Sequence, residues 1–185
     1  QNSLRDALVA GTTLNIFNNH CERVKMANLA QTVNVLQALI LTKGHQMLLT
    51  PTYHVFDLYK VHQDAKYLPV QISSPDYTVD GQKLPALNVS ASQDSTGTVH
   101  ISLVNLDAKN NITIRTALNG VNWKSVTGQI ITSAKFTDIN TFEKPGAIQQ
   151  AAFKDAKKEG NDLVVNLPKL SVVVLKKKKK KKKKL

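Results

Sequence analysis

The stretch Arg23–Gln63, RVKMANLAQTVNVLQALILTKGHQMLLTPTYHVFDLYKVHQ, decides the predicted fold. It predicts a buried strand over residues 24–30 and a helix over residues 51–63, for which Thr50-Pro51 supplies the N-cap and the first helical position. This unit cannot stand alone, because a lone strand leaves backbone groups unpaired on both edges, and one strand with one helix buries too little apolar surface to offset chain entropy. The stretch therefore predicts one slice of a larger barrel or open sheet, in a chain that is part of a longer protein.

The net charge of +12 comes mainly from one segment. Nine of the 25 basic residues form the run Lys176–Lys184, and without it 16 basic residues face 13 acidic ones, a net charge of +3. We expect this run to be disordered by self-repulsion. We interpret it as a tag or a misread-sequence feature, with a native polyanion-binding tail as the alternative. The balanced remainder argues against specific nucleic-acid binding.

The sequence carries few compartment signals. Cys21 is the single cysteine, which excludes an internal disulfide framework and a multi-cysteine metal site. Because no apolar run reaches the roughly eighteen residues of a membrane span, no membrane partner is expected. Gln1-Asn2-Ser3 does not begin a signal peptide. In a piece of a longer protein this leaves the compartment open, either cytoplasmic or secreted and periplasmic in a bacterium.

The periodicity of the sequence changes at Leu68-Pro69. Before this point, residues 4–19 carry apolar side chains at helical spacing, with Asn2 or Ser3 as the N-cap. After it, apolar and polar residues alternate between closely spaced turn signals, which indicates an antiparallel sandwich or jelly roll. The predicted strands span residues 69–73, 86–93, 98–105, 111–118, 125–132, 151–154, 162–166 and 171–175, with a long surface loop over 138–149.

No group of residues predicts a complete active site. Glycoside hydrolysis needs two carboxylates flanking the scissile bond, yet solvated surface charges are the expected state of Asp57 and of all three glutamates, Glu22, Glu143 and Glu159. His54 and His62 can share one helix face, but a metal site needs a third ligand. GxSxG, HExxH and Gly-rich phosphate motifs are missing from the sequence. We predict no catalytic residue, no metal site and no cofactor for this chain.

Gln31 is the best-placed polar residue, because it ends the predicted strand, where barrel enzymes build their active sites. Its amide donates and accepts hydrogen bonds without adding charge, which suits a sugar hydroxyl beside catalytic carboxylates. Spacing alone leaves a second interpretation open, in which Gln31 satisfies backbone groups at the strand end.

Several segments together match one enzyme family: LRDALVA at 4–10, LNIF at 14–17, RVKMANLAQ at 23–31, VNV at 33–35, LTPTYHVF at 49–56, Tyr59, NTFE at 140–143, LP at 167–168 and SVVVL at 171–175. At these residues the sequence resembles the C-terminal part of the α-L-arabinofuranosidases of glycoside hydrolase family 51. The resemblance covers nearly everything from Leu4 to Leu175, and residues 23–35 are its most specific part.

This resemblance implies a mainly β chain. A jelly-roll-like antiparallel β-sandwich is preceded by the last α-β-α elements of a (β/α)₈ barrel, so the expected parts are a barrel remnant, the sandwich and a poly-lysine tail (1–67, 68–175 and 176–185). In that frame the barrel elements are the helix after the seventh strand, the eighth strand and its helix (4–19, 24–31 and 51–63). Gln31 then matches the family glutamine that hydrogen-bonds the arabinofuranose.

The resemblance also implies a retaining parent enzyme that releases terminal α-L-arabinofuranosyl units from arabinan, arabinoxylan or their oligosaccharides. Both family catalytic glutamates belong to strands that precede this segment, so we expect the chain alone to be inactive. In the family a strand from the N-terminal end joins the sandwich, and its absence predicts an open edge and a homo-oligomer. The competing interpretation is a free-standing carbohydrate-binding sandwich that uses an exposed Trp123.

Overall fold

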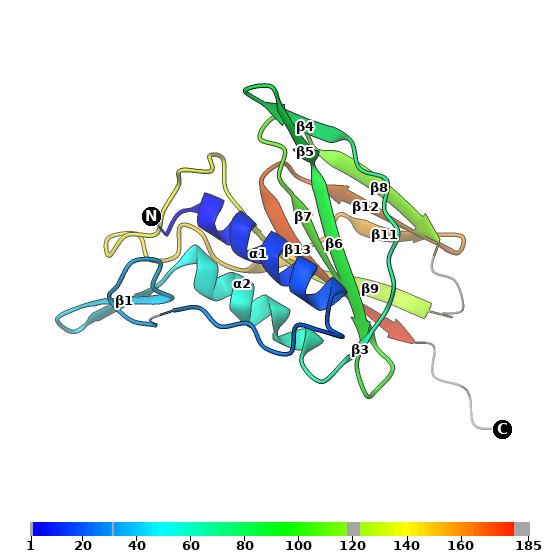
Figure 1. Ribbon diagram of the computed structural model, residues 1–185, viewed down its shortest axis with the longest axis horizontal. Coiled ribbons are helices and arrows are strands. Elements are labelled where there is room, and N and C mark those ends of the chain that lie inside the picture. Colours follow the sequence, from blue (N-terminus) through cyan, green and yellow to red (C-terminus); the bar gives the residue numbers. More distant parts are fainter. Residues whose placement is uncertain (1, 31, 118–122, 180–185) are drawn as a thin grey trace.

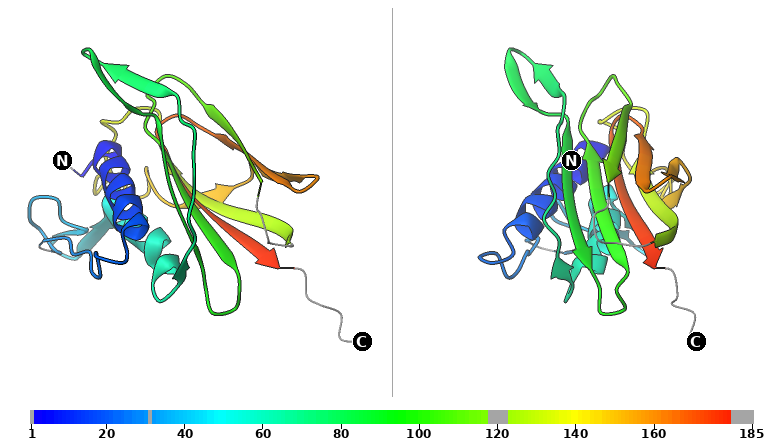
Figure 2. Two further views of the ribbon diagram at one scale, coloured as in Figure 1. Left: turned by 45° about the vertical axis from the view of Figure 1, so that its right-hand side comes forward. Right: turned by 90° about the vertical axis from the view of Figure 1, so that its right-hand side faces the viewer.

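The structure is a computed structural model that describes residues 2–30, 32–117 and 123–179. Its elements form three layers (Figure 1). Two helices cover one face of a six-stranded antiparallel sheet, and a three-stranded antiparallel sheet covers the other face. Figure 2 shows the helices and the smaller sheet on opposite sides of the large sheet. The chain is therefore mainly β, as predicted.

The helix predicted over residues 4–19 is α1, Leu4–Asn19. Ser3 is its N-cap, and the Asp6 carboxylate accepts a hydrogen bond from the Ser3 backbone N–H at 2.8 Å, as in a capping box. Its buried stripe faces the large sheet, and Gly11 brings the two into close contact. A Cβ at Gly11 would lie 3.1 Å from Val104 Cγ2 and 3.3 Å from Val172 Cγ2.

The helix predicted over residues 51–63 is α2, Pro51–Tyr59, followed by the 3₁₀ turn η1, Lys60–His62. Thr50 is the N-cap, as predicted, and its hydroxyl accepts a hydrogen bond from the Tyr53 N–H at 3.4 Å. The same hydroxyl donates to the Ala38 carbonyl at 3.0 Å. Thr50 therefore joins the start of α2 to the loop that precedes it.

The strand predicted over residues 24–30 is wrong. These residues have no regular secondary structure, and the chain next forms a short antiparallel hairpin of β1, Ile40–Lys43, and β2, Gln46–Leu49. The physical reason is the absence of partners, since no other described strand lies beside residues 24–30 to pair with their backbone groups.

The strands of the two main sheets correspond closely to the sequence pattern. The large sheet has the order β10-β9-β13-β7-β6-β3, with β3 Lys66–Tyr67, β6 Leu87–Gln93, β7 Val99–Asn105, β9 Trp123–Thr132, β10 Ala151–Phe153 and β13 Ser171–Lys179. The small sheet has the order β11-β12-β8, with β8 Ile112–Ala117, β11 Ala156–Glu159 and β12 Asp162–Leu167. The predictions for β6 to β10, β12 and β13 are thus confirmed to within a few residues at each end.

Two regions of the sheet differ from the sequence prediction. The strand predicted over residues 69–73 is wrong, because this segment begins at Pro69 and runs without backbone pairing after the short β3. The turn at Asp80-Gly81 instead joins an unpredicted hairpin of β4, Asp76–Val79, and β5, Gln82–Pro85. The strand β11, whose sequence AKKE has no apolar alternation, was also missed.

The two faces of the large sheet carry two apolar cores. The sandwich core lies between the sheets and includes Leu103, Trp123, Ile130, Leu163, Val173 and Leu175. The helix-side core lies under α1 and α2 and includes Leu4, Leu8, Val55, Leu58, Val104, Val172 and Val174. The period-two alternation of β13 supplies both cores at once.

The expected disorder of the lysine run is wrong for residues 176–179, where β13 continues beside β9, and up to Lys177 also beside β7. These neighbouring strands provide backbone partners, so pairing persists despite the charge. Lys177 is only 2% exposed, and its Nζ lies 4.6 Å from the Trp123 ring centroid without a hydrogen-bond partner. Burial, with help from the Lys158 charge, lowers the pKa of Lys177 to about 8. Residues 180–185 lie outside the described part of the chain.

We predict that Lys177→Met increases the free energy of unfolding by about 1 kcal/mol, because methionine fills the site over Trp123 without a buried, unpaired ammonium. Lys176→Met is the matched control, since Lys176 is exposed. The unfolded chain holds the extra proton between pH 8 and 10.5, so wild-type stability rises with pH in that window and the Lys177→Met protein lacks this rise. Thermal unfolding measures both effects. A lower Tm for Lys177→Met than for Lys176→Met would show that the cation–π contact dominates.

We predict that Gly11→Leu destabilises the protein by about 1–3 kcal/mol, because the new side chain forces α1 away from Val104 and Val172. Val9→Leu is the control, since Val9 is exposed on the same helix. Chemical denaturation of the two variants measures the difference. Equal stabilities would contradict the close packing of α1 on the sheet.

Candidate functional site

Gln31, the predicted sugar-binding residue, lies outside the described residues. The segment that follows it is fixed by the β1–β2 hairpin: the Thr32 carbonyl accepts hydrogen bonds from the Leu39 and Ile40 N–H groups at 3.1 Å each. Asn34 and Thr42 exchange two further hydrogen bonds of 2.7 Å. The role of Gln31 therefore stays a prediction.

A hollow of about 310 Å³ lies between the two helices and residues 27–29. Its lining is mostly apolar and includes Leu14, Phe17, Leu29 and Phe56. Asp6 is the one carboxylate in this lining, and the Ser3 backbone N–H already donates to it. The hollow therefore offers no carboxylate pair for acid–base catalysis.

The glutamates lie on the surface, as expected. Glu22 Oε1 lies 3.7 Å from His20 Nδ1, and the Glu143 side chain is exposed. Glu159 forms ion pairs with Lys157 at 2.8 Å and with Arg115. Each of them acts as a surface charge in the described structure.

Asp57 differs in that it links α2 to the long loop before β10. Its carboxylate accepts hydrogen bonds from Lys60 Nζ and Gln150 Nε2, both at 2.6 Å. The hydrogen bonds from Lys60 and Gln150 lower the pKa of Asp57 below its usual value. This carboxylate is held as an anion in a structural contact.

The histidines His54 and His62 do not form a joint site. The His54 ring contacts Tyr53 edge-on, whereas His62 lies in η1 and bonds to the large sheet. Across the described ranges, no three His, Cys, Asp or Glu side chains lie close enough together to hold a metal ion.

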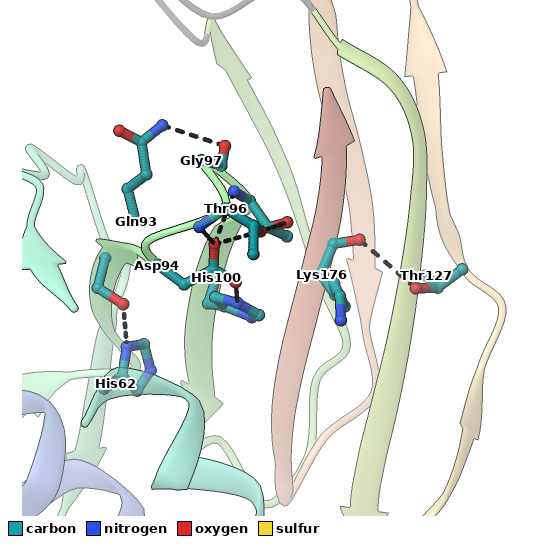
Figure 3. Close-up of polar contacts among 10 residues, drawn as sticks. His62, Gln93, Asp94, Thr96, Gly97, His100, Thr127 and Lys176 are labelled. Carbon is teal, nitrogen blue, oxygen red and sulfur yellow. Dashed lines mark hydrogen bonds and ion pairs between the residues drawn. The ribbon is translucent and has the colours of Figure 1, made fainter. Parts of the chain in front are cut away.

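The best-organised polar cluster joins η1 to strands β6 and β7. Figure 3 shows its members His62, Asp94 and His100. His62 Nδ1 lies 2.8 Å from Ser92 Oγ, and His62 Nε2 lies 2.5 Å from Ser102 Oγ. Next to them, His100 Nε2 lies 3.0 Å from Asp94 Oδ2. We call these five residues the histidine–serine cluster.

Asp94 organises the hairpin between β6 and β7. Its Oδ1 accepts hydrogen bonds from the backbone N–H groups of Thr96 and Thr98, both at 2.9 Å. Burial opposes ionisation, but the hydrogen bonds from Thr96, His100 and Thr98 outweigh it and hold the pKa of Asp94 well below its usual range. Both oxygens of the Asp94 carboxylate are therefore engaged, Oδ1 with the backbone of the turn and Oδ2 with His100.

The cluster contains serine, histidine and aspartate, yet its geometry does not form a catalytic triad. The Ser102 hydroxyl belongs to a fully buried residue, so no substrate reaches it. Asp94 orients His100, while the ring that contacts the two serines is His62. A nucleophile–base–orienter chain needs one histidine to contact both partners. The cluster is a structural contact that holds η1 against strands β6 and β7.

Sequence reasoning missed this contact, because Ser92 and Ser102 lie 30 and 40 residues after His62 in the chain. One signal was available. Ser90, Ser92, His100 and Ser102 alternate with apolar residues on β6 and β7, and their face of the sheet lies under the helices. Four polar residues on a buried face require partners, which predicts polar contacts from the covering layer.

The suggestion that Trp123 is exposed is wrong. Trp123 is 2% exposed and belongs to the sandwich core, and Phe153 is buried there too. Among the described aromatic residues, Phe136 is the large exposed one, at 46%. These positions do not provide the flat row of exposed rings that a carbohydrate-binding module presents.

A second hollow, of about 830 Å³, opens between the two sheets at one side of the sandwich. We call it the sandwich groove. It is lined by the segment 68–75 and by β6, β7, β8 and β12, with Val70 and Ile72 exposed at its rim. The strand β8 pairs with β12 on one side and has no described partner strand on the side of the groove. The described helices include none with the length and apolar content of a membrane span.

Comparison with known proteins identifies the family. Residues 1–171 match the family described as "Alpha-L-arabinofuranosidase C-terminal domain". The chain is 46% identical over 174 residues to an intracellular exo-alpha-L-arabinofuranosidase of Bacteroides ovatus, covering 94% of this chain and 34% of that protein. A shorter match of 75 residues, 35% identical, links 40% of the chain to 15% of an intracellular exo-alpha-(1->5)-L-arabinofuranosidase of Bacillus subtilis.

Solved structures agree with this match. The GH51 arabinofuranosidase from Xanthomonas axonopodis pv. citri superposes with a TM-score of 0.94 at 48% identity, over 96% of this chain and 36% of that one. The arabinofuranosidase from Thermotoga maritima shares the fold, with a TM-score of 0.81 at 21% identity over 94% of this chain and 38% of that one. The chain spans about a third of the length of the Bacteroides ovatus enzyme and of the Xanthomonas axonopodis enzyme. By sequence and by structure, the chain belongs to the alpha-L-arabinofuranosidase C-terminal domain family.

Proposed function

We propose that this chain is the C-terminal part of a retaining α-L-arabinofuranosidase that releases terminal arabinofuranosyl units from arabinan, arabinoxylan or their oligosaccharides. The observation that carries the proposal is an uncovered apolar surface on residues 1–67. Large apolar side chains are exposed there on α1, on the irregular segment and on β2, namely Val9, Ile16, Met26, Val33, Leu36 and Met47. Met26 and Leu36 are 74% and 70% exposed, which is unusual for a surface without a partner.

The remainder of a (β/α)₈ barrel accounts for this surface. In a barrel, residues 24–31 gain strand neighbours on both edges, and the exposed side of α1 gains neighbouring helices. The helices α1 and α2 already pack on the six-stranded sheet through the helix-side core. Residues 1–67 are then the barrel remnant and residues 68–175 a jelly-roll-like sandwich that supports it.

In this proposal Gln31 hydrogen-bonds the arabinofuranose, and both catalytic glutamates come from the preceding part of the parent. The chain alone is then inactive, because a retaining mechanism needs two carboxylates about 5 Å apart. The two curated relatives are both named intracellular enzymes, which supports an intracellular parent. A free-standing carbohydrate-binding module is the weaker candidate, because Trp123 is buried.

A chimaera tests the proposed function. Residues 1–175 replace the matching third of the Bacteroides ovatus enzyme, and hydrolysis of an aryl α-L-arabinofuranoside is measured. We expect the chimaera to turn over the substrate and the isolated chain to show none. We expect Gln31→Ala in the chimaera to reduce kcat/KM about tenfold or more through the lost hydrogen bonds to the sugar.

Gln46→Ala is the matched control, because Gln46 is an exposed glutamine of the β1–β2 hairpin. A chimaera that melts cooperatively but is inactive would refute the assignment to this enzyme. Turnover by the rigorously purified chain alone would refute the division of catalytic residues. Equal kcat/KM for the Gln31 and Gln46 variants would remove Gln31 from the substrate site.

We also propose that the isolated chain forms a homodimer through the sandwich groove. No described strand covers the groove side of β8, so this edge offers backbone donors and acceptors beside an apolar groove. The same edge on a second copy can pair with it antiparallel around a two-fold axis. In the proposed parent, the N-terminal strand that the family resemblance implies takes this place.

We predict a dimer in size-exclusion chromatography with light scattering, and a monomer for the double variant Val70→Lys, Ile72→Lys, which places two charges at the groove rim. Both residues are exposed, so the fold is retained. The comparison variant Val9→Lys, Leu36→Lys changes the uncovered surface of residues 1–67 instead. A strict monomer at high concentration would refute self-association, and a monomer only for the second variant would move the interface to that surface.

A further inference from the structure

The histidine–serine cluster fastens one end of the helix layer to the large sheet. His62 is the last residue of η1, and its ring bonds to Ser92 of β6 and Ser102 of β7 with its two nitrogens. The two serines lie on different strands, so one imidazole ties η1 to both of them. Figure 3 shows the His62 ring pointing from the helix layer toward the strands.

The cluster lies in a setting that disfavours charge. Ser92, Ser102 and His100 are buried, and the Tyr59 ring lies 5.6 Å from the His62 ring. Apolar residues of the helix-side core surround the Tyr59 contact. A neutral imidazole fits the site, because one nitrogen donates to a hydroxyl while the other accepts from the second hydroxyl.

The titratable and charged groups around His62 offer it no anion. From β7 it faces His100, and Lys176 of β13 is the cross-strand neighbour of His100. From α2 it faces the Tyr59 hydroxyl, which donates to the Gly11 carbonyl at 3.1 Å. Within η1 itself, Lys60 is paired with Asp57 at 2.6 Å.

The one nearby carboxylate is already in use. Asp94 bonds to His100 and to the backbone of its own turn, as described above. Among the described residues no carboxylate contacts His62. Burial, and then the charge of His100, therefore lower the pKa of His62 to about 4.

We propose that His62 is an acid-sensitive latch between η1 and strands β6 and β7. When His62 gains a proton, both ring nitrogens become donors, and a positive charge lies near His100 with no described carboxylate in contact with the ring. The η1 turn and the end of α2 then detach from the sheet, so the ring is hydrated.

The direction of the pH effect follows from linkage. The free imidazole in the detached state has the usual pKa of about 6.5, and the docked ring has a pKa of about 4. Between these values the detached state binds more protons, so docking weakens as the pH falls. The ratio of detached to docked molecules rises roughly threefold between pH 7 and pH 6, more steeply below pH 6, and by roughly sixtyfold in total between pH 7 and pH 4.5.

Hydrogen–deuterium exchange of residues 58–64, corrected for the intrinsic pH dependence of exchange, measures this ratio. We expect protection of η1 to fall roughly sixtyfold between pH 7 and pH 4.5, while the β7–β13 pairing loses far less protection. In His62→Gln the amide still donates and accepts but does not titrate, so this pH dependence disappears. His45→Gln is the control, since His45 is exposed in the β1–β2 hairpin.

An NMR titration of the wild-type ring gives an independent readout if His62→Gln does not fold. We expect the His62 ring protons to titrate with a pKa near 4. A pKa near 6.5 for His62 would overturn the proposal. Equal loss of η1 protection in the wild type and His62→Gln would overturn it as well.

Discussion

The strand β13 is the element on which the other layers depend. It pairs with β7 on one edge and with β9 on the other, and its alternate side chains enter the two apolar cores. Val173 and Leu175 contact the small sheet, while Val172 and Val174 contact the helices. A change in its register by one residue would exchange these two sets and disrupt both cores together. The register of β13 therefore decides how both the helices and the small sheet pack on the large sheet.

The same constraint explains why lysines continue the strand. Once residues 171–175 are fixed between two neighbours, the backbone of 176–179 meets donors and acceptors already in position. Lys177 then falls on the side of Leu175 and enters the sandwich core beside Trp123, while Lys176 falls on the side of Val174. Backbone pairing thus fixes which lysine is buried. Its charge only determines how unfavourable that burial is.

The sequence predicts those elements that carry a clear local pattern of apolar, polar and capping residues. Period-two alternation located β6, β7 and β13, and the Thr50-Pro51 signal located the start of α2. It failed where the outcome depends on distant partners. Residues 24–30 have the composition of a buried strand but lack strand neighbours, and His62 finds its partners 30 and 40 residues away. The role of Gln31 in the candidate site stays a prediction, because Gln31 lies outside the described residues.

The contrast between residues 24–30 and β13 separates two requirements of a strand. Both segments are apolar enough to be buried, and both have β-branched or aliphatic side chains. Only β13 has a neighbour on each edge, and only β13 is regular. Apolar composition thus supplies the tendency to be buried, while paired edges supply the geometry. Met26 is exposed whereas Val173 is buried, because residues 24–30 meet the first requirement without the second.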